Sequence, residues 1–152
     1  MADPYVAGLA MLARRELSEA QVRRRLTRRG FDADEVDRAI DRLRQERALD
    51  DARTAAAIAR TQVAIRGRGR LRVRREIEAA GIAASVAERA VDELFQDIDP
   101  QSLLDAALSR RLRGAATIDD EATFRRLYRY LVTQGFDSER VLQALRARRA
   151  RR

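Results

Sequence analysis

The 152-residue chain contains no cysteine and no histidine. Without cysteine there can be no disulfide or thiolate chemistry, and without histidine the commonest metal ligand and general base is missing. No apolar run is long enough for a membrane span, and no leader marks an export signal, so we expect a cytoplasmic protein with no membrane partner. No pattern in the sequence indicates a nucleophile with its base or a set of metal ligands. We therefore expect no enzymatic activity and no cofactor.

Helix-breaking and strand-forming residues are scarce. The chain has two prolines and seven glycines, and aromatic residues make up 5% of it. The remainder is dominated by alanine, leucine, valine and arginine, a mixture that favours helix and is poor material for strands. Since 45% of the residues are hydrophobic, the chain can still bury a core. These proportions predict an all-α fold.

Lysine is also absent, so all 32 basic residues are arginine. The formal net charge is +8, which indicates polyanions or acidic proteins as partners. The arginine usage has two explanations, which can both hold. One is the codon bias of a GC-rich genome, and the other is selection for bidentate contacts to phosphate or carboxylate.

The chain repeats one phrase three times. "RGFDADEVDRAI" around Gly30 returns as "QGFDSERVLQAL" around Gly135, and "REIEAAGIAASVAERAVDEL" supplies a looser copy around Gly81. Aligned on these glycines, apolar residues fall into columns at helical spacing. The columns are Val22, Val73 and Leu127; Leu26, Ile77 and Leu131; Phe31, Ile82 and Phe136; Val36, Ala87 and Val141; Ala39, Ala90 and Ala144; and Ile40, Val91 and Leu145.

Each copy is predicted to be a helix, a glycine turn and a second helix. Glycine is the usual residue just past a helix end, because it enters the left-handed region at low cost. Asp32 and Asp137 follow the turn and are expected to cap the next helix. The expected cap pairs are Ser18 with Gln21, Asp32 with Glu35, and Ser85 with Glu88 for a middle helix that starts later. Three acidic clusters could be metal ligands: Asp50-Asp51, Asp92-Glu93 and Asp119-Asp120-Glu121. Because histidine is absent and the first and third lie near predicted helix starts, we expect helix caps and dipole partners instead.

One more apolar-periodic stretch precedes each copy, at residues 5–16, 51–65 and 101–113. We therefore expect three tandem three-helix repeat modules, at residues 1–49, 50–99 and 100–152, the last with a basic C-terminal tail. One module is too small to bury its apolar faces alone, so neighbouring modules must stack. The expected shape is an elongated, curved, right- or left-handed rod.

The order of these signals resembles the RecX family of bacterial regulatory proteins. "RRELSEAQVRRRLTRRGFDADEVDRAIDRLRQERALDDARTAAAIAR" is similar to the core signature of that family, and "RGRGRLRVRREIEAAGI" to its second segment. Two positions depart from the pattern. Arg47 stands where the family often has glycine, and Thr54 stands where an aromatic residue is usual.

The resemblance implies three tandem three-helix repeats and binding to RecA protein and to RecA–single-stranded DNA filaments. It also implies modulation, usually inhibition, of ATP hydrolysis, strand exchange and co-protease activity, and hence a role in homologous recombination, DNA repair and the SOS response. DNA is a further direct partner to consider, and we expect a monomer.

Arginines recur at equivalent places in the copies. Arg24, Arg75 and Arg129 stand six residues before the three glycines, off the apolar columns. In a stack of repeats, such positions can form a ladder that matches a row of phosphates or a repeating acidic surface. The alternative is an ordinary charged helix face. The predicted binding residues are Arg24, Arg75, Arg129, Arg23, Arg74, Arg72, Arg126, Arg66, Arg68 and Arg70.

"RGRGRLRVRR" at 66–75 is the densest basic stretch. Gly67 and Gly69 predict a flexible loop that can follow a nucleic-acid backbone, although a solvated linker is the alternative. The runs at 110–113 and 146–152 are weaker candidates. Tyr128 is expected in the core, and Tyr130 is not expected to stack on a base.

Two other classes of function are also compatible with the sequence. The helix, glycine turn and helix at 19–46 could belong to a helix-turn-helix protein that reads DNA sequence. However, the helix after the turn, "DADEVDRAIDRLR", is rich in aspartate, which would repel phosphates. The other class is a general DNA or RNA binder, or a helical scaffold for an acidic protein.

Overall fold

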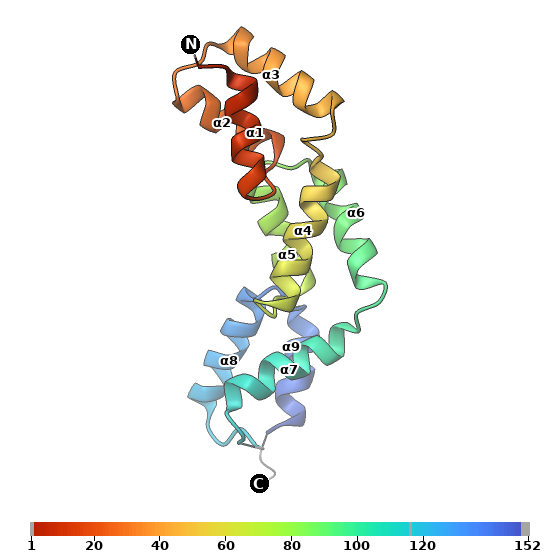
Figure 1. The fold of residues 1–152 in the computed structure, drawn as a ribbon. Coiled ribbons are helices and arrows are strands. Elements are labelled where there is room, and N and C mark those ends of the chain that lie inside the picture. The colour runs from red at the N-terminus through yellow and green to blue at the C-terminus, as the bar shows by residue number, and fades with distance from the viewer. Residues whose placement is uncertain (1, 116, 150–152) are drawn as a thin grey trace. The chain divides into compact units, whose positions relative to one another are not determined.

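The computed structural model describes residues 2–115 and 117–149, and this part of the chain is helical apart from turns and one isolated bridge between Ile118 and Arg149. Its helices are α1 (Pro4–Arg14), α2 (Glu19–Arg28), α3 (Ala33–Gln45), α4 (Asp51–Ala64), α5 (Arg70–Ala79), α6 (Ala84–Phe95), α7 (Pro100–Leu112), α8 (Glu121–Thr133) and α9 (Ser138–Ala147) (Figure 1). They follow one another as three groups of three, which confirms the all-α repeat architecture. Residues 150–152 of the predicted basic tail lie outside the described residues.

The three predicted glycine turns are present. Gly30, Gly81 and Gly135 have φ angles of 96°, 83° and 97°, which lie in the left-handed region that other residues avoid. In the first turn the amides of Gly30 and Phe31 donate to carbonyls of the last turn of α2, at 3.0 and 3.4 Å. The turn after α8 repeats both hydrogen bonds, so the repeated sequence phrase encodes a repeated Schellman motif.

Most of the predicted helix caps are confirmed. Capping boxes join Ser18 with Gln21 and Asp32 with Glu35. Asp137 accepts from the amide of Arg140, as the start of α9 requires. The prediction for the middle copy was wrong. There α6 begins at Ala84 rather than after Ser85, because the carbonyl of Ala83 accepts the first helical hydrogen bonds.

The apolar columns form the core. Sixteen of their eighteen members are buried, with at most 7% of their surface exposed, and Phe31 and Ala144 are half-buried. The helices predicted at residues 5–16, 51–65 and 101–113 are observed as α1, α4 and α7, with ends that differ by one or two residues. Because the columns on both sides of each glycine turn are buried, the three copies share the same spacing of apolar residues even where their other residues differ.

The described chain divides into two compact units. Unit 1 comprises the described residues up to Ile58 together with Glu76–Ala90, and unit 2 comprises Ala59–Arg75 and the described residues from Val91 onward. The helices α4, α5 and α6 therefore contribute one part to each unit. The division into modules at residues 1–49, 50–99 and 100–152 stays a prediction.

Unit 1 is built around the core of α1, α2 and α3. The end of α5 and the start of α6 pack onto this core at the beginning of α2. There the buried hydroxyl of Ser18 donates a hydrogen bond to the carbonyl of Ala80. A Cβ atom on Gly81 would lie 2.5 Å from the Cβ atom of Ala20, so this contact also depends on a glycine.

Unit 2 is built around the core of α7, α8 and α9. The segment before α5 packs against the turn between α8 and α9. The amide of Gly69 donates to the carbonyl of Gln134 at 2.8 Å, and the amide of Leu71 donates to the carbonyl of Gly135 at 3.1 Å. These backbone contacts fix the basic stretch at 66–75 on the surface of the unit.

Candidate protein and nucleic-acid interface

The arginines six residues before each glycine share one environment. Arg24, Arg75 and Arg129 lie on the second helix of their groups, and all three are exposed. None of their guanidinium groups forms an ion pair or a hydrogen bond with another described residue. Their guanidinium groups can therefore meet a phosphate or carboxylate without first breaking an internal contact.

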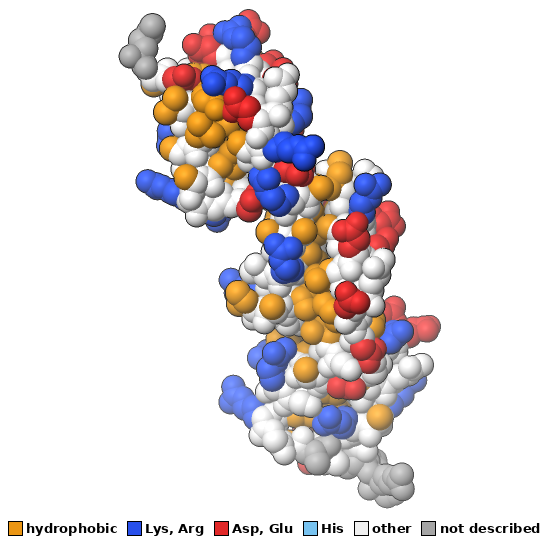
Figure 2. Space-filling model, turned by 45° about the vertical axis from the view of Figure 1, so that its right-hand side comes forward, with side chains coloured by type: hydrophobic (Ala, Val, Ile, Leu, Met, Phe, Trp, Pro, Cys, Tyr) orange, Lys and Arg blue, Asp and Glu red, His pale blue; other side chains and the backbone are white. Residues whose placement is uncertain are grey.

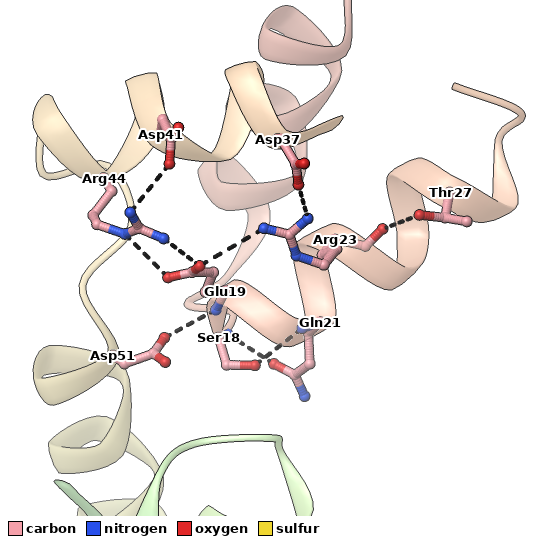
Figure 3. Close-up of polar contacts among 9 residues, drawn as sticks. All are labelled: Ser18, Glu19, Gln21, Arg23, Thr27, Asp37, Asp41, Arg44 and Asp51. Atoms are coloured by element: carbon pink, nitrogen blue, oxygen red, sulfur yellow. Dashed lines mark hydrogen bonds and ion pairs between the residues drawn. The ribbon is translucent and has the colours of Figure 1, made fainter. Parts of the chain in front are cut away.

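Arg23, the neighbour of Arg24, is engaged within unit 1. Figure 3 shows its guanidinium between Asp37 of α3 and Glu19 of α2, and its Nη2 lies 4.0 Å from the Glu19 carboxylate. Arg44 approaches the same Glu19 carboxylate from α3 and bonds Asp41 at 3.1 Å. Since this network joins α2 to α3, Arg23 would have to leave it in order to bind a partner.

The basic stretch at 66–75 is packed, and the prediction of a freely flexible loop was wrong. Gly67 and Gly69 are buried, and the backbone at Gly69 is hydrogen-bonded to the turn after α8. The glycines serve close packing: a Cβ atom on Gly69 would lie 2.7 Å from the backbone carbonyl group of Gly135. Any partner of this segment therefore meets a shaped surface.

The side chains of this stretch divide into two kinds. Arg68 donates to the side-chain oxygen of Gln62 at 2.7 Å, Arg72 donates to the carbonyl of Thr133 at 3.1 Å, and Arg70 forms an ion pair with Asp92. Arg74 is half-buried. Arg66, in contrast, is exposed, and its side chain forms no ion pair or hydrogen bond with a described residue. The same holds for the side chain of Arg126 on α8, which lies near Asp120.

Basic and acidic side chains are interspersed on the face of each unit that Figure 2 shows. Many arginines of the chain form ion pairs with nearby carboxylates. Arg42 pairs with Glu46 at 3.1 Å, and Arg53 pairs with Glu16 at 2.8 Å. The exposed arginines without such partners are therefore the ones on which a polyanion or an acidic protein can act.

The first and third acidic clusters cap helices, as predicted. Asp50 accepts from the amide of Arg53 at 3.1 Å, and Asp120 accepts from the amide of Thr123 at 2.7 Å. This amide, followed by the Thr123 hydroxyl, holds the pKa of Asp120 below its ordinary value. The described residues contain no cluster of carboxylates that could hold a metal ion.

The structure brings the weaker candidate run at 110–113 together with Tyr130 and Arg126, a grouping that the sequence did not predict. The guanidinium of Arg111 lies 3.9 Å from the centre of the Tyr130 ring, and Arg113 and Arg126 line the same cavity of about 520 Å³. Asp119 and Asp120 also line it. Arg111 lies in the last turn of α7 and Tyr130 lies on α8. They are too far apart in the sequence for helical spacing to predict their contact. Tyr128, as expected, packs against the core.

Two family models match the chain. Residues 5–43 match the family model described as RecX, first three-helix domain, and residues 50–91 match RecX, second three-helix domain. The chain belongs to the RecX family. A "Regulatory protein RecX" of Acidithiobacillus ferrooxidans is 34% identical over 149 residues, which cover 98% of this chain and 93% of the relative. One of Syntrophotalea carbinolica is 32% identical over 143 residues, 93% of each chain.

Two solved RecX structures have the same fold. The first, a regulatory protein RecX, superimposes with a TM-score of 0.77 at 21% identity, covering 95% of this chain and 70% of the other. RecX from Lactobacillus salivarius gives a TM-score of 0.76 at 20% identity, covering 95% of both chains.

No helix in residues 2–115 and 117–149 combines the length and apolar character that crossing a bilayer requires.

The two departures from the RecX pattern have local structural explanations. Arg47 has a φ of 59°, so it occupies the left-handed conformation that glycine adopts at little cost. Thr54 is buried, and its hydroxyl donates to the Glu16 carboxylate at 3.1 Å and approaches the Leu17 carbonyl at 3.3 Å. Threonine therefore satisfies polar groups at a position where an aromatic ring could only fill space.

Proposed function

We propose that this protein binds RecA and RecA–single-stranded DNA filaments and inhibits ATP hydrolysis and strand exchange, without catalytic activity of its own. The observation that carries the proposal is membership of the RecX family over nearly the whole chain, with relatives that are named regulatory proteins. The proposal places the protein in the cytoplasm, in homologous recombination, DNA repair and the SOS response.

The exposed arginines supply the contacts in this proposal. A filament presents phosphates and protein carboxylates at regular intervals, and repeats of this chain present Arg24, Arg75 and Arg129 at equivalent positions. Arg66 and Arg126 add two more exposed cations. A protein held on the filament by such contacts hinders the subunit movements that accompany nucleotide hydrolysis. The remaining predicted residues, Arg23, Arg68, Arg70, Arg72 and Arg74, shape the surface and contribute less.

Sequence-specific DNA readout is less well supported. The helix after the first glycine turn, α3, exposes Asp34, Asp37 and Asp41. Carboxylates on that helix would face the phosphates of a major groove and repel them. The relevant nucleic-acid contact is therefore to the backbone and not to base edges.

The test follows ATP turnover by RecA on single-stranded DNA while the purified protein is added. Turnover should fall and reach a low plateau at saturation, and strand exchange should fall with it. Unchanged turnover at saturating protein, with RecA active in a parallel reaction, would discard the proposal. Binding of DNA without RecA should be weaker and should fall steeply between about 50 and 200 mM salt.

A further inference from the structure

An apolar pocket lies in unit 2 where the start of α5, the end of α6 and the turn before α9 come together. Its volume is about 320 Å³, at the lower end of the range for ligand sites. Leu71, Phe95, Leu103 and Phe136 supply apolar surface to its lining. A pocket of this size suits one or two side chains and is small for a cofactor.

The pocket has a fixed wall. Backbone hydrogen bonds from Gly69 and Leu71 to the turn at Gln134 and Gly135 hold the start of α5 in place. Leu71 nevertheless leaves 51% of its surface exposed, in a chain of which 37% of the residues are charged. A large, half-exposed aliphatic side chain at the mouth of a preformed apolar pocket is typical of an anchoring point for a partner side chain.

Cationic groups stand beside the apolar lining. Arg70 lies over the Phe95 ring, with its guanidinium carbon 5.7 Å from the ring centre, and forms an ion pair with Asp92. Arg140 is exposed and makes no side-chain ion pair with a described residue. Asp137, the carboxylate of the lining, keeps its charge and accepts the amide of Arg140 at 3.1 Å as the cap of α9. Two arginines and one aspartate line the pocket, so the lining has an excess of positive charge, and Arg140 is the cation that a partner carboxylate can meet.

We propose that this pocket takes a large apolar side chain of a protein partner that is flanked, in the partner, by carboxylates. A partner that made only phosphate contacts would not need the apolar lining. A nucleic-acid base would need an open aromatic ring on which to stack, but Phe136 is buried and Arg70 lies over Phe95. The inference rests on the proposed function and deepens it, since it assigns a contact of the filament's protein component.

The first experiment uses the full chain and RecA–single-stranded DNA filaments. Leu71→Ser and Arg140→Glu should each weaken filament binding about 10-fold, because an apolar anchor and a carboxylate partner are lost. Leu71→Ser should leave the affinity for single-stranded DNA alone unchanged. Val6→Ser is the matched control: Val6 is 57% exposed, lies outside the pocket and should not alter filament binding.

The outcomes separate the two claims. If the wild-type chain binds filaments and both pocket variants bind equally well, the pocket inference is wrong and the proposed function stands. If the wild-type chain does not bind filaments, the proposed function fails, and the pocket is then decided by peptides. A variant that disrupts self-association in light scattering, but not filament or peptide binding, would assign the pocket to a second copy and overturn the inference.

The peptide experiment uses the isotopically labelled chain and three synthetic hexapeptides. Asp-Asp-Leu-Phe-Asp-Asp should shift the amide signals of Gly69, Leu71 and Gly135, and Leu71→Ser should abolish these shifts. Arg-Arg-Leu-Phe-Arg-Arg and Asp-Asp-Ala-Ala-Asp-Asp should leave the signals in place. Equal behaviour of the three peptides, or shifts confined to other residues, would contradict the inference. Because Arg140 is exposed, Arg140→Glu keeps the test open should Leu71→Ser fail to fold.

Discussion

Gly69 and Gly135 lie with their backbones in contact: a Cβ atom on Gly69 would lie 2.7 Å from the Gly135 carbonyl carbon, and the Gly135 carbonyl accepts the amide of Leu71 at 3.1 Å. Two segments distant in sequence therefore meet through residues without side chains. Gly69→Ala should lower the free energy of unfolding by roughly 1–3 kcal/mol, as overpacking does. Urea denaturation followed by circular dichroism measures the loss.

Alanine substitutions at Gly30 and Gly135 distinguish the cost of steric crowding from the cost of backbone strain. Their φ angles, 96° and 97°, are nearly equal, but a Cβ atom on Gly30 would meet nothing within 4 Å, whereas one on Gly135 would collide with the backbone of Arg72. Gly30→Ala should cost only the left-handed penalty, about 1–2 kcal/mol. Gly135→Ala should cost more. Equal losses in denaturant would mean that the packing of the 66–75 segment on this turn contributes nothing.

Arg47→Gly should stabilise the protein. Arg47 has a φ of 59°, and it forms its hydrogen bonds with described residues through the backbone. Its amide donates to the Arg44 carbonyl at 3.0 Å and its carbonyl accepts from Arg53 at 3.0 Å, and glycine would keep both. The gain should be about 1 kcal/mol, because relief of the left-handed strain outweighs the added freedom of the unfolded chain. Arg44→Gly, inside the preceding helix α3, should destabilise instead. A lower denaturation midpoint for Arg47→Gly would refute the strain argument.

The caps of α7 and α8 make stability depend on acid. The Ser102 hydroxyl holds the pKa of Asp99 below 3.8, and the Thr123 amide does the same for Asp120. A lowered pKa in the folded state contributes stability above 3.8, and this contribution disappears as the pH falls through the folded value. The difference in unfolding free energy between wild type and Asp120→Ala should therefore narrow as the pH falls below about 5. A constant difference would contradict the ionic role of the cap.

The sequence predicts the fold well because the repeat is written into local chemistry. Glycine turns, capping boxes and columns such as Leu26, Ile77 and Leu131 each act within one helix pair, and the structure reproduces them. Leu26→Ala should therefore cost about 2–5 kcal/mol through a core cavity. The prediction at Ser85 was wrong, because a carbonyl of any residue can start a helix.

The candidate surface was less predictable, because charge pairing is a property of the tertiary structure. Arg23 and Arg24 are neighbours in sequence, yet Arg23 pairs with Asp37 of another helix while Arg24 stays exposed. The same applies to Arg111, whose stacking on Tyr130 joins two helices. The flexibility inferred from Gly67 and Gly69 was wrong for a related reason. A glycine that permits motion in an isolated loop permits close packing in a folded chain.

The exposed arginines can be tested as a set. Changing Arg24, Arg75 and Arg129 together to alanine should weaken binding to RecA filaments at least about 10-fold and leave the helical content unchanged. A control with the same loss of charge changes Arg14, Arg28 and Arg60, which are exposed and lie outside the predicted binding residues. If both triple variants lose affinity equally, net charge rather than position governs binding.

Co-sedimentation of the purified protein with RecA, with and without single-stranded DNA, tests the central claim most directly. The protein should pellet with RecA–DNA filaments at a saturable ratio, at a salt concentration where it no longer binds the same DNA without RecA. Equal retention by DNA alone and by filaments across the salt series would mean that the protein recognises a polyanion and not the recombinase.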